Sequence, residues 1–166
     1  SNFLDIGPGY GDSLDVCYEQ GAKSLDFVEI DPVFFTYNRL KRYTKGYCIN
    51  HMIGLQKLEP AKYHLIWVKG SVSADFFIAS KLNVRNVWLL HWLTQLERLA
   101  SSTCRIVICP HWANNSHKRD IEDLEHNLLS ETMLKKGYLI LRGLKNHNQE
   151  PGYPITFYKT TARIPE

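Results

Sequence analysis

The feature that most constrains this chain is a run of glycines directly after a short apolar segment near its start. Residues 3–6 have the length and composition of a buried parallel strand. Gly7, Gly9 and Gly11 follow at alternate positions. Glycine lets a backbone turn sharply and approach a ligand with no Cβ in the way, and the helix after the run offers its positive N-terminal end. The arrangement predicts an α/β protein with a nucleotide-type ligand at the end of its first strand.

The rest of the chain alternates helices and strands until its last third. After a helix at residues 12–20 and a second strand at 24–30, three further parallel strands are predicted at 47–50, 64–68 and 105–110. Further helices are predicted from Pro32 to a point before Gly46, and at residues 72–82, 84–100 and 118–136. Residues 138–144 and 155–158 form two strands with no helix between them, so they must pair antiparallel. The expected fold is α/β, a doubly wound, mostly parallel seven-stranded sheet ending in an antiparallel hairpin, with helices on both faces.

The composition fits one ordinary domain. A chain of 166 residues, 44% hydrophobic and 22% charged, can bury a sizeable core. No apolar stretch is long enough for a bilayer and no signal peptide is visible, so we expect a cytoplasmic protein without a membrane partner. A net charge of +3 does not indicate a nucleic-acid partner. The basic cluster at residues 39–45 is expected to be a solvated helix face.

Cysteine and histidine spacing argues against a metal site. The four cysteines contain no CxxC pair, and three of them lie in apolar segments, where a free thiol packs as a small hydrophobe. The histidines show no i,i+4 or HxH arrangement. We therefore expect neither a metal nor a disulfide framework.

Two motifs resemble those of a known family, the class I S-adenosylmethionine-dependent methyltransferases. The family's first motif is apolar-Asp-apolar-Gly-x-Gly-x-Gly, matched by Leu-Asp-Ile-Gly-Pro-Gly-Tyr-Gly at residues 4–11. Its second is an acid closing strand two, matched by Val-Glu-Ile-Asp-Pro at residues 28–32. The family's sheet also ends in an antiparallel hairpin, so the resemblance covers nearly the whole chain. It implies a Rossmann-like fold and S-adenosylmethionine as the cofactor.

The resemblance also implies a set of cofactor-binding residues. These are Asp5, Gly7, Gly9, Gly11, Glu29 and Asp31. Asp5 commonly helps to hold the aminoacyl end of the cofactor. Glu29 is placed to accept hydrogen bonds from two ribose hydroxyls, which an ionised carboxylate does well. Asp31 either helps with the ribose or caps the next helix, and both alternatives stay open.

The chain departs from the family pattern at three places. Family members usually have an acid after strand three that holds the adenine amino group, whereas this chain has Asn-His-Met at residues 50–52. The adenine contact must therefore come from a backbone group, from Asn50 or from nothing. Residues 68–71 read Val-Lys-Gly-Ser rather than the Asn/Asp-Pro-Pro-Tyr of members that methylate DNA or protein glutamine. The helices that usually precede strand one are missing, so we expect residues 1–166 to be one domain without its substrate-recognition helices.

The substrate side is expected beyond the ends of strands four and five, because ligands of open α/β sheets bind there. Lys69, Ser71 and Trp112 are the candidate substrate-binding residues. His111 is the candidate catalytic residue, since an imidazole near neutrality can take a proton from an attacking hydroxyl or amine. In the alternative interpretation His111 and Trp112 are a surface loop pair whose indole covers the sheet edge.

Three functions follow from these patterns. The leading one is metal-free methyl transfer from S-adenosylmethionine to a small molecule or an exposed polymer group, achieved mainly by positioning. The second is a methyltransferase-like binding or scaffold domain without activity, which the missing acid after strand three favours. The third is an NAD(P)-dependent oxidoreductase, but that class expects its third glycine one residue later and a parallel sixth strand.

Overall fold

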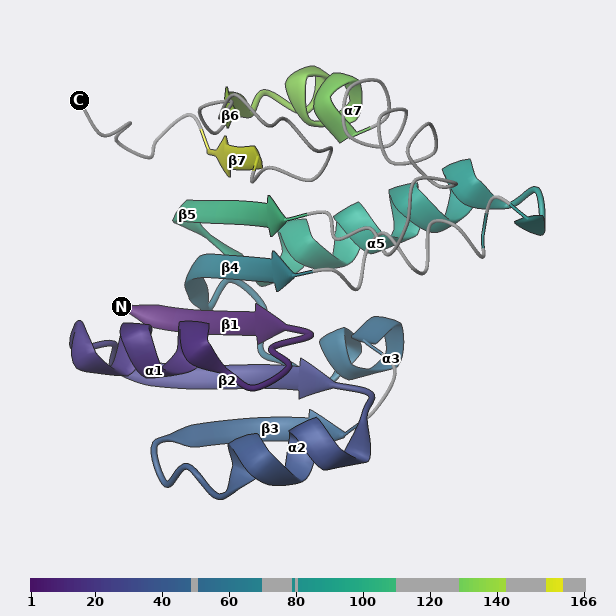
Figure 1. Ribbon diagram of the computed structural model, residues 1–166. Coiled ribbons are helices and arrows are strands. Elements are labelled where there is room, and N and C mark those ends of the chain that lie inside the picture. Colours follow the sequence, from purple (N-terminus) through teal and green to yellow (C-terminus); the bar gives the residue numbers. More distant parts are fainter. Residues whose placement is uncertain (49–50, 70–78, 80, 110–128, 143–154, 160–166) are drawn as a thin grey trace, which may run out of the picture.

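In the computed structural model the chain forms a seven-stranded mixed sheet flanked by helices (Figure 1). The structure describes residues 1–48, 51–69, 79, 81–109, 129–142 and 155–159. The strands are β1 (Asn2–Ile6), β2 (Ser24–Glu29), β3 (Thr44–Cys48), β4 (Tyr63–Lys69), β5 (Ala100–Cys109), β6 (Leu139–Arg142) and β7 (Ile155–Tyr158). The helices within the described residues are α1 (Asp12–Glu19), α2 (Pro32–Arg39), α3 (His51–Gln56), α5 (Arg85–Leu99) and α7 (Ser130–Lys135). The strand order across the sheet is β3-β2-β1-β4-β5-β7-β6.

Strands β1 to β5 run parallel, and β7 lies antiparallel between β5 and β6. The registers align the strand ends, because Ile6 faces both Val28 and Val68, and Val68 faces Ile108. The carboxyl ends of β1, β2, β4 and β5 therefore meet at one edge of the sheet, which we call the carboxyl edge; the opposite edge is the amino edge. The predicted fold class is confirmed, including the antiparallel hairpin.

Alternate residues of β1 point to opposite faces of the sheet and so divide the core in two. Leu4 and Ile6 pack with buried side chains of α3, α5 and α7. Phe3 packs on the other face with Leu14 of α1, and Phe35 of α2 adds to this cluster. Because both faces are covered, the central parallel strands read as continuous apolar runs rather than as alternating ones.

Strand β3 lies earlier in the chain than the sequence predicts. It spans Thr44–Cys48 instead of residues 47–50, and α2 ends at Arg39. Gly46, which favours a helix end in the sequence, lies inside this strand. The position requires glycine because a Cβ there would be 2.2 Å from the ring of Phe27 in β2. Helix α3 was not predicted, since its 6 residues are too few to show a helical period.

Helix α5 matches the predicted element but buries a narrower face. Apolar residues recur at helical spacing in this segment, and they include Val87, Leu90, Trp92 and Leu96. Trp92 and Leu96 are buried, whereas Val87 and Leu90 are 74% and 55% exposed. Strand β5 begins at residue 100, directly after α5, where the sequence predicts a start at residue 105. Among the described helices, none is long and apolar enough to cross a membrane.

Candidate functional site

The glycine run forms a tight loop at the carboxyl edge, between β1 and α1 (Figure 1). The backbone is left-handed at Gly7, Gly9 and Gly11, with φ of 73°, 58° and 78°. The Gly7 N–H donates to the Val28 carbonyl at 2.9 Å, which ties the loop to the end of β2. Within the described part of the chain, no side chain caps the N-terminus of α1, so its first N–H groups can face an anionic ligand group.

Two of these glycines have different surroundings. A Cβ at Gly11 would lie 1.9 Å from Oδ1 of Asn38, a residue of α2. A Cβ at Gly9 would have no described atom within 4 Å. Gly11 is therefore packed against the protein, whereas Gly9 borders open space that a ligand can fill.

Glu29 joins the glycine loop to the end of β2. Its side chain is buried, and Oε2 accepts a hydrogen bond from the Gly9 N–H at 3.2 Å. Oε1 accepts one from the Asp31 N–H at 3.0 Å. Each carboxylate oxygen has two lone pairs, so each keeps one for a ligand hydroxyl. The structure thus brings the predicted residues Gly9 and Glu29 together.

Asp31 caps helix α2. Its Oδ1 accepts a hydrogen bond from the Val33 N–H at 2.8 Å, and Pro32 occupies the first helical position. Of the two roles that the sequence left open, the structure shows the cap. A contact between Asp31 and a ribose stays a prediction.

Asp5 is fully buried in β1, next to the loop. The Ser13 hydroxyl of α1 donates to its carboxylate, which fixes the first turn of α1 to the strand. Burial raises the pKa of the nearby Cys17 thiol, and the charge of Asp5 raises it further. Cys17 is therefore a protonated thiol near neutral pH rather than a nucleophile.

Two residues that the sequence analysis missed hold the carbonyls of the loop. Asn38 is fully buried, and its Nδ2 donates to the Gly9 carbonyl at 2.7 Å. The Lys41 ammonium donates to the carbonyls of Tyr10 and Gly11, both at 3.3 Å. Three consecutive loop carbonyls are thus fixed by side chains from α2 and from the residues that follow it. Such support holds the loop in one conformation before any ligand binds.

The expectation that residues 39–45 form a solvated helix face is wrong for Lys41, which contacts α1 and the glycine loop. Its ammonium forms an ion pair with Asp15 of α1 at 2.6 Å, and the Tyr43 hydroxyl donates to the same carboxylate. Burial raises the pKa of Asp15, but the hydrogen bonds from Lys41 and Tyr43 outweigh this effect and lower it. Burial and the bond to Asp15 raise the pKa of Tyr43 to about 12. A basic run alone carries no sequence signal that separates Lys41 from its solvated neighbours.

Of the residues predicted for the substrate side, Lys69 lies within the described part of the chain. Lys69 is the last residue of β4 and so lies at the carboxyl edge. Ser71, His111 and Trp112 lie outside the described residues, as does Asn50. In the part of the chain that the structure describes, no group of three or more His, Cys, Asp or Glu side chains could hold a metal ion.

This chain is similar to known proteins in structure but not in sequence. No protein-family model and no curated protein sequence matches this chain. A SAM dependent methyltransferase from Archaeoglobus fulgidus is similar at a TM-score of 0.63 and 15% identity, covering 95% of this chain and 86% of that one. An S-adenosylmethionine dependent methyltransferase from Mesorhizobium loti is similar at a TM-score of 0.62 and 12% identity, covering 95% and 90%.

Two further structures extend this picture. The plantazolicin methyltransferase in complex with a triazolic desmethylPZN analog and SAH (S-adenosylhomocysteine) is similar at a TM-score of 0.64 and 12% identity, covering 96% of this chain and 77% of that one. A putative sarcosine dimethylglycine methyltransferase from Galdieria sulphuraria is similar at a TM-score of 0.58 and 16% identity. The similarity covers 86% of this chain and 56% of that longer one. The strand order, the antiparallel hairpin and these similarities show that the chain has the fold of the class I S-adenosylmethionine-dependent methyltransferases.

Proposed function

We propose that this chain binds S-adenosylmethionine and transfers its methyl group to an acceptor. The observation that carries the proposal is the hydrogen bond from the Gly9 N–H to Glu29 at 3.2 Å, which sets an open glycine loop beside a buried carboxylate. Both lie at the carboxyl edge, where open α/β sheets bind their ligands. The fold shared with solved methyltransferases, one of them in complex with SAH, supports this cofactor.

The residues at the loop fit the chemistry of this cofactor. Its ribose has two hydroxyl donors, and the Glu29 carboxylate keeps acceptor capacity for both. Its carboxylate suits the N–H groups at the start of α1, and the open space at Gly9 leaves room for it. The residues that we assign to the cofactor are Asp5, Gly7, Gly9, Gly11, Glu29 and Asp31.

When bound, the cofactor supplies a methyl group on a positively charged sulfur that leaves readily as a neutral thioether. The chain must then hold the acceptor in line with that methyl group and accept its proton. We assign the proton to His111 and substrate contacts to Lys69, Ser71 and Trp112, because these residues end or follow β4 and β5 in the sequence. A small molecule is the acceptor that we propose.

Two alternative functions, a scaffold and an oxidoreductase, differ from methyl transfer in the features that they require. The scaffold function is favoured by Asn50, which stands where the family usually has an adenine-binding acid. The oxidoreductase function is opposed by β7, which runs antiparallel to β5 where a dinucleotide-binding sheet continues in parallel.

Isothermal titration of the chain with S-adenosylmethionine, SAH and NAD tests the proposal. We expect S-adenosylmethionine and SAH to bind and NAD not to bind, and binding of NAD alone would contradict the proposal.

The Gly9→Val variant should lose the binding heat because its side chain enters the ligand space. Gly21→Val is the matched control, since Gly21 is also left-handed and also has no described atom near its Cβ position. Transfer of labelled methyl to a panel of small acceptors then separates the enzyme from the scaffold.

A further inference from the structure

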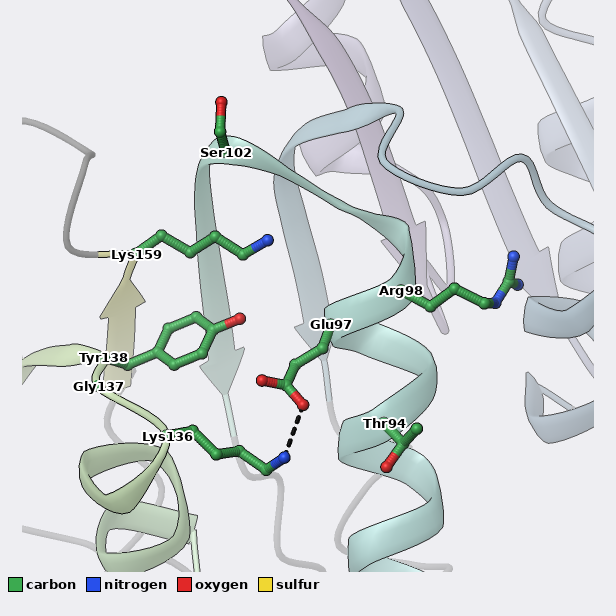
Figure 2. A pocket seen from close by; sticks show the side chains of 8 residues that line it. All are labelled: Thr94, Glu97, Arg98, Ser102, Lys136, Gly137, Tyr138 and Lys159. Atoms are coloured by element: carbon green, nitrogen blue, oxygen red, sulfur yellow. Dashed lines mark hydrogen bonds and ion pairs between the residues drawn. The ribbon is translucent and has the colours of Figure 1, made fainter.

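A pocket lies at the amino edge of the sheet, opposite the carboxyl edge that holds the glycine loop. Figure 2 shows the side chains that line this pocket. The pocket has a volume of about 710 Å³ and lies between the end of α5, the start of β5, the turn from α7 to β6, and the residue after β7. Its lining includes Glu97, Lys136, Tyr138 and Lys159. Residues 102 and 108 of β5 are six positions apart, so the pocket and the carboxyl edge are about 20 Å apart at the rise of a strand.

The Tyr138 hydroxyl is the first sign of a ligand. The side chain is 4% exposed, and its oxygen has no hydrogen-bond partner in the described structure. Figure 2 shows the hydroxyl pointing across the pocket toward α5, between Lys159 and Glu97. A buried hydroxyl without a partner is costly, so such a group calls for an explanation. Burial and the charge of Glu97 raise the pKa of Tyr138, so it remains a donor at neutral pH.

The charges of the lining indicate an anion. The Lys136 ammonium is neutralised by Glu97 in an ion pair of 2.7 Å. The Arg98 guanidinium turns away from the pocket, as Figure 2 shows, and donates to the Leu55 carbonyl at 2.6 Å. The Lys159 ammonium donates to a backbone carbonyl, that of Ala100, at 2.9 Å, and no carboxylate of the described residues pairs with it. Among the described residues, the positive charge of Lys159 on the pocket wall is therefore not compensated by an ion pair.

We propose that this pocket binds a small oxyanion, a carboxylate or a phosphate, through the Tyr138 hydroxyl and the Lys159 ammonium. Figure 2 shows both groups reaching into the pocket from its β6 and β7 side. An oxyanion accepts from a hydroxyl and an ammonium at once, which satisfies the first and compensates the second. A water molecule could satisfy the hydroxyl but would leave the charge of Lys159 in place. The site does not depend on the glycine loop or on methyl transfer.

Thermal unfolding in phosphate, in acetate and in chloride at equal ionic strength tests the proposal. A ligand that binds only the folded state raises the melting temperature with its concentration. We expect phosphate, acetate or both to do so beyond chloride, and the more effective anion identifies the natural chemistry. Lys159→Met should remove the effect. Lys135→Met, an exposed lysine one residue before Lys136 and outside the lining, should keep it.

Tyr138→Phe gives a second test that does not depend on the stability of the Lys159 variant. It deletes only a hydroxyl without a partner, so in chloride it should melt at the same or a higher temperature than the parent. Its affinity for the anion should fall about tenfold, the loss of one hydrogen bond to a charged group. An NMR titration should shift the amides of Gly137, Tyr138 and Lys159 rather than those of Gly9 and Gly11. No anion effect beyond chloride, equal losses in both lysine variants, or shifts confined to the glycine loop would each overturn the proposal.

Discussion

At the residue scale, Gly9 and Gly11 share a backbone conformation but differ in what surrounds them. Alanine at either position costs about 1–2 kcal/mol because the backbone is left-handed. At Gly11 its Cβ would also overlap Asn38 Oδ1, which we expect to cost about 1–3 kcal/mol more, the range for overpacking. Urea denaturation should therefore show Gly11→Ala to be the less stable variant. Gly21→Ala, with φ of 78° and no described neighbour at its Cβ, isolates the backbone term.

If Gly9→Ala and Gly11→Ala lose equal stability, Asn38 does not pack under the loop as described. Equal losses at Gly11 and Gly21 would lead to the same conclusion.

The ion pair of Asp15 makes stability depend on pH in the acid range. The folded-state pKa of Asp15 lies below its ordinary value of 3.8, so its stabilising contribution is complete above that value and is lost as pH falls through the lowered one. The free energy of unfolding of the parent should therefore drop more steeply below pH 4 than that of Asp15→Asn. Asp12→Asn, at an exposed position of the same helix turn, is the control. If the free energies of unfolding of the parent and of Asp15→Asn fall equally steeply below pH 4, the ion pair of Asp15 does not stabilise the fold as described.

We propose His111 as the proton acceptor in methyl transfer and not as a cofactor-binding residue. A proton acceptor acts in the transition state, so His111→Ala should lower the rate of methyl transfer by about 10²–10⁴-fold while SAH affinity stays nearly unchanged. His64→Ala, an exposed histidine of β4, is the matched control. An unchanged rate on the true acceptor would reduce His111 and Trp112 to a surface pair.

At the scale of single elements, β3 depends on a contact between a glycine and a phenylalanine ring. Gly46→Ala should cost about 1–3 kcal/mol of unfolding free energy, because the new Cβ would meet the Phe27 ring. The double variant Gly46→Ala/Phe27→Leu should be more stable than the sum of the single changes predicts, since the smaller side chain makes room. Additive costs in urea denaturation would show that the two positions do not touch.

The elements that the sequence predicts well are those whose signals are local. The sequence predicts β1, the glycine loop after it and β2 from an apolar run, alternate glycines and the acids that close β2. α3 is too short to show a period, and the position of Gly46 depends on a ring from another strand. The support of the loop by Asn38 and Lys41 also depends on contacts across 29 to 31 positions of the chain. Such long-range contacts leave no pattern in a single sequence.

At the scale of the whole molecule, the two candidate sites lie at opposite edges of the mixed sheet. The fold class could be predicted because a helix-free connection near the end forces an antiparallel pair. The proximity of the glycine loop and Glu29 could be predicted because both follow neighbouring strands near the start of the chain. The amino-edge pocket could not be predicted, since Glu97, Tyr138 and Lys159 meet there from separate elements.

The central claim is that Glu29 holds the ribose of the cofactor while Asp31 caps α2. Isothermal titration with SAH should show Glu29→Ala to bind about 1.5–3 kcal/mol more weakly than the parent, the range for hydrogen bonds to a charged group. Asp31→Ala should lose less SAH affinity than Glu29→Ala, and it should also lose about 1 kcal/mol of unfolding free energy, as for a lost helix cap. A larger loss of SAH affinity at Asp31 than at Glu29 would contradict the account.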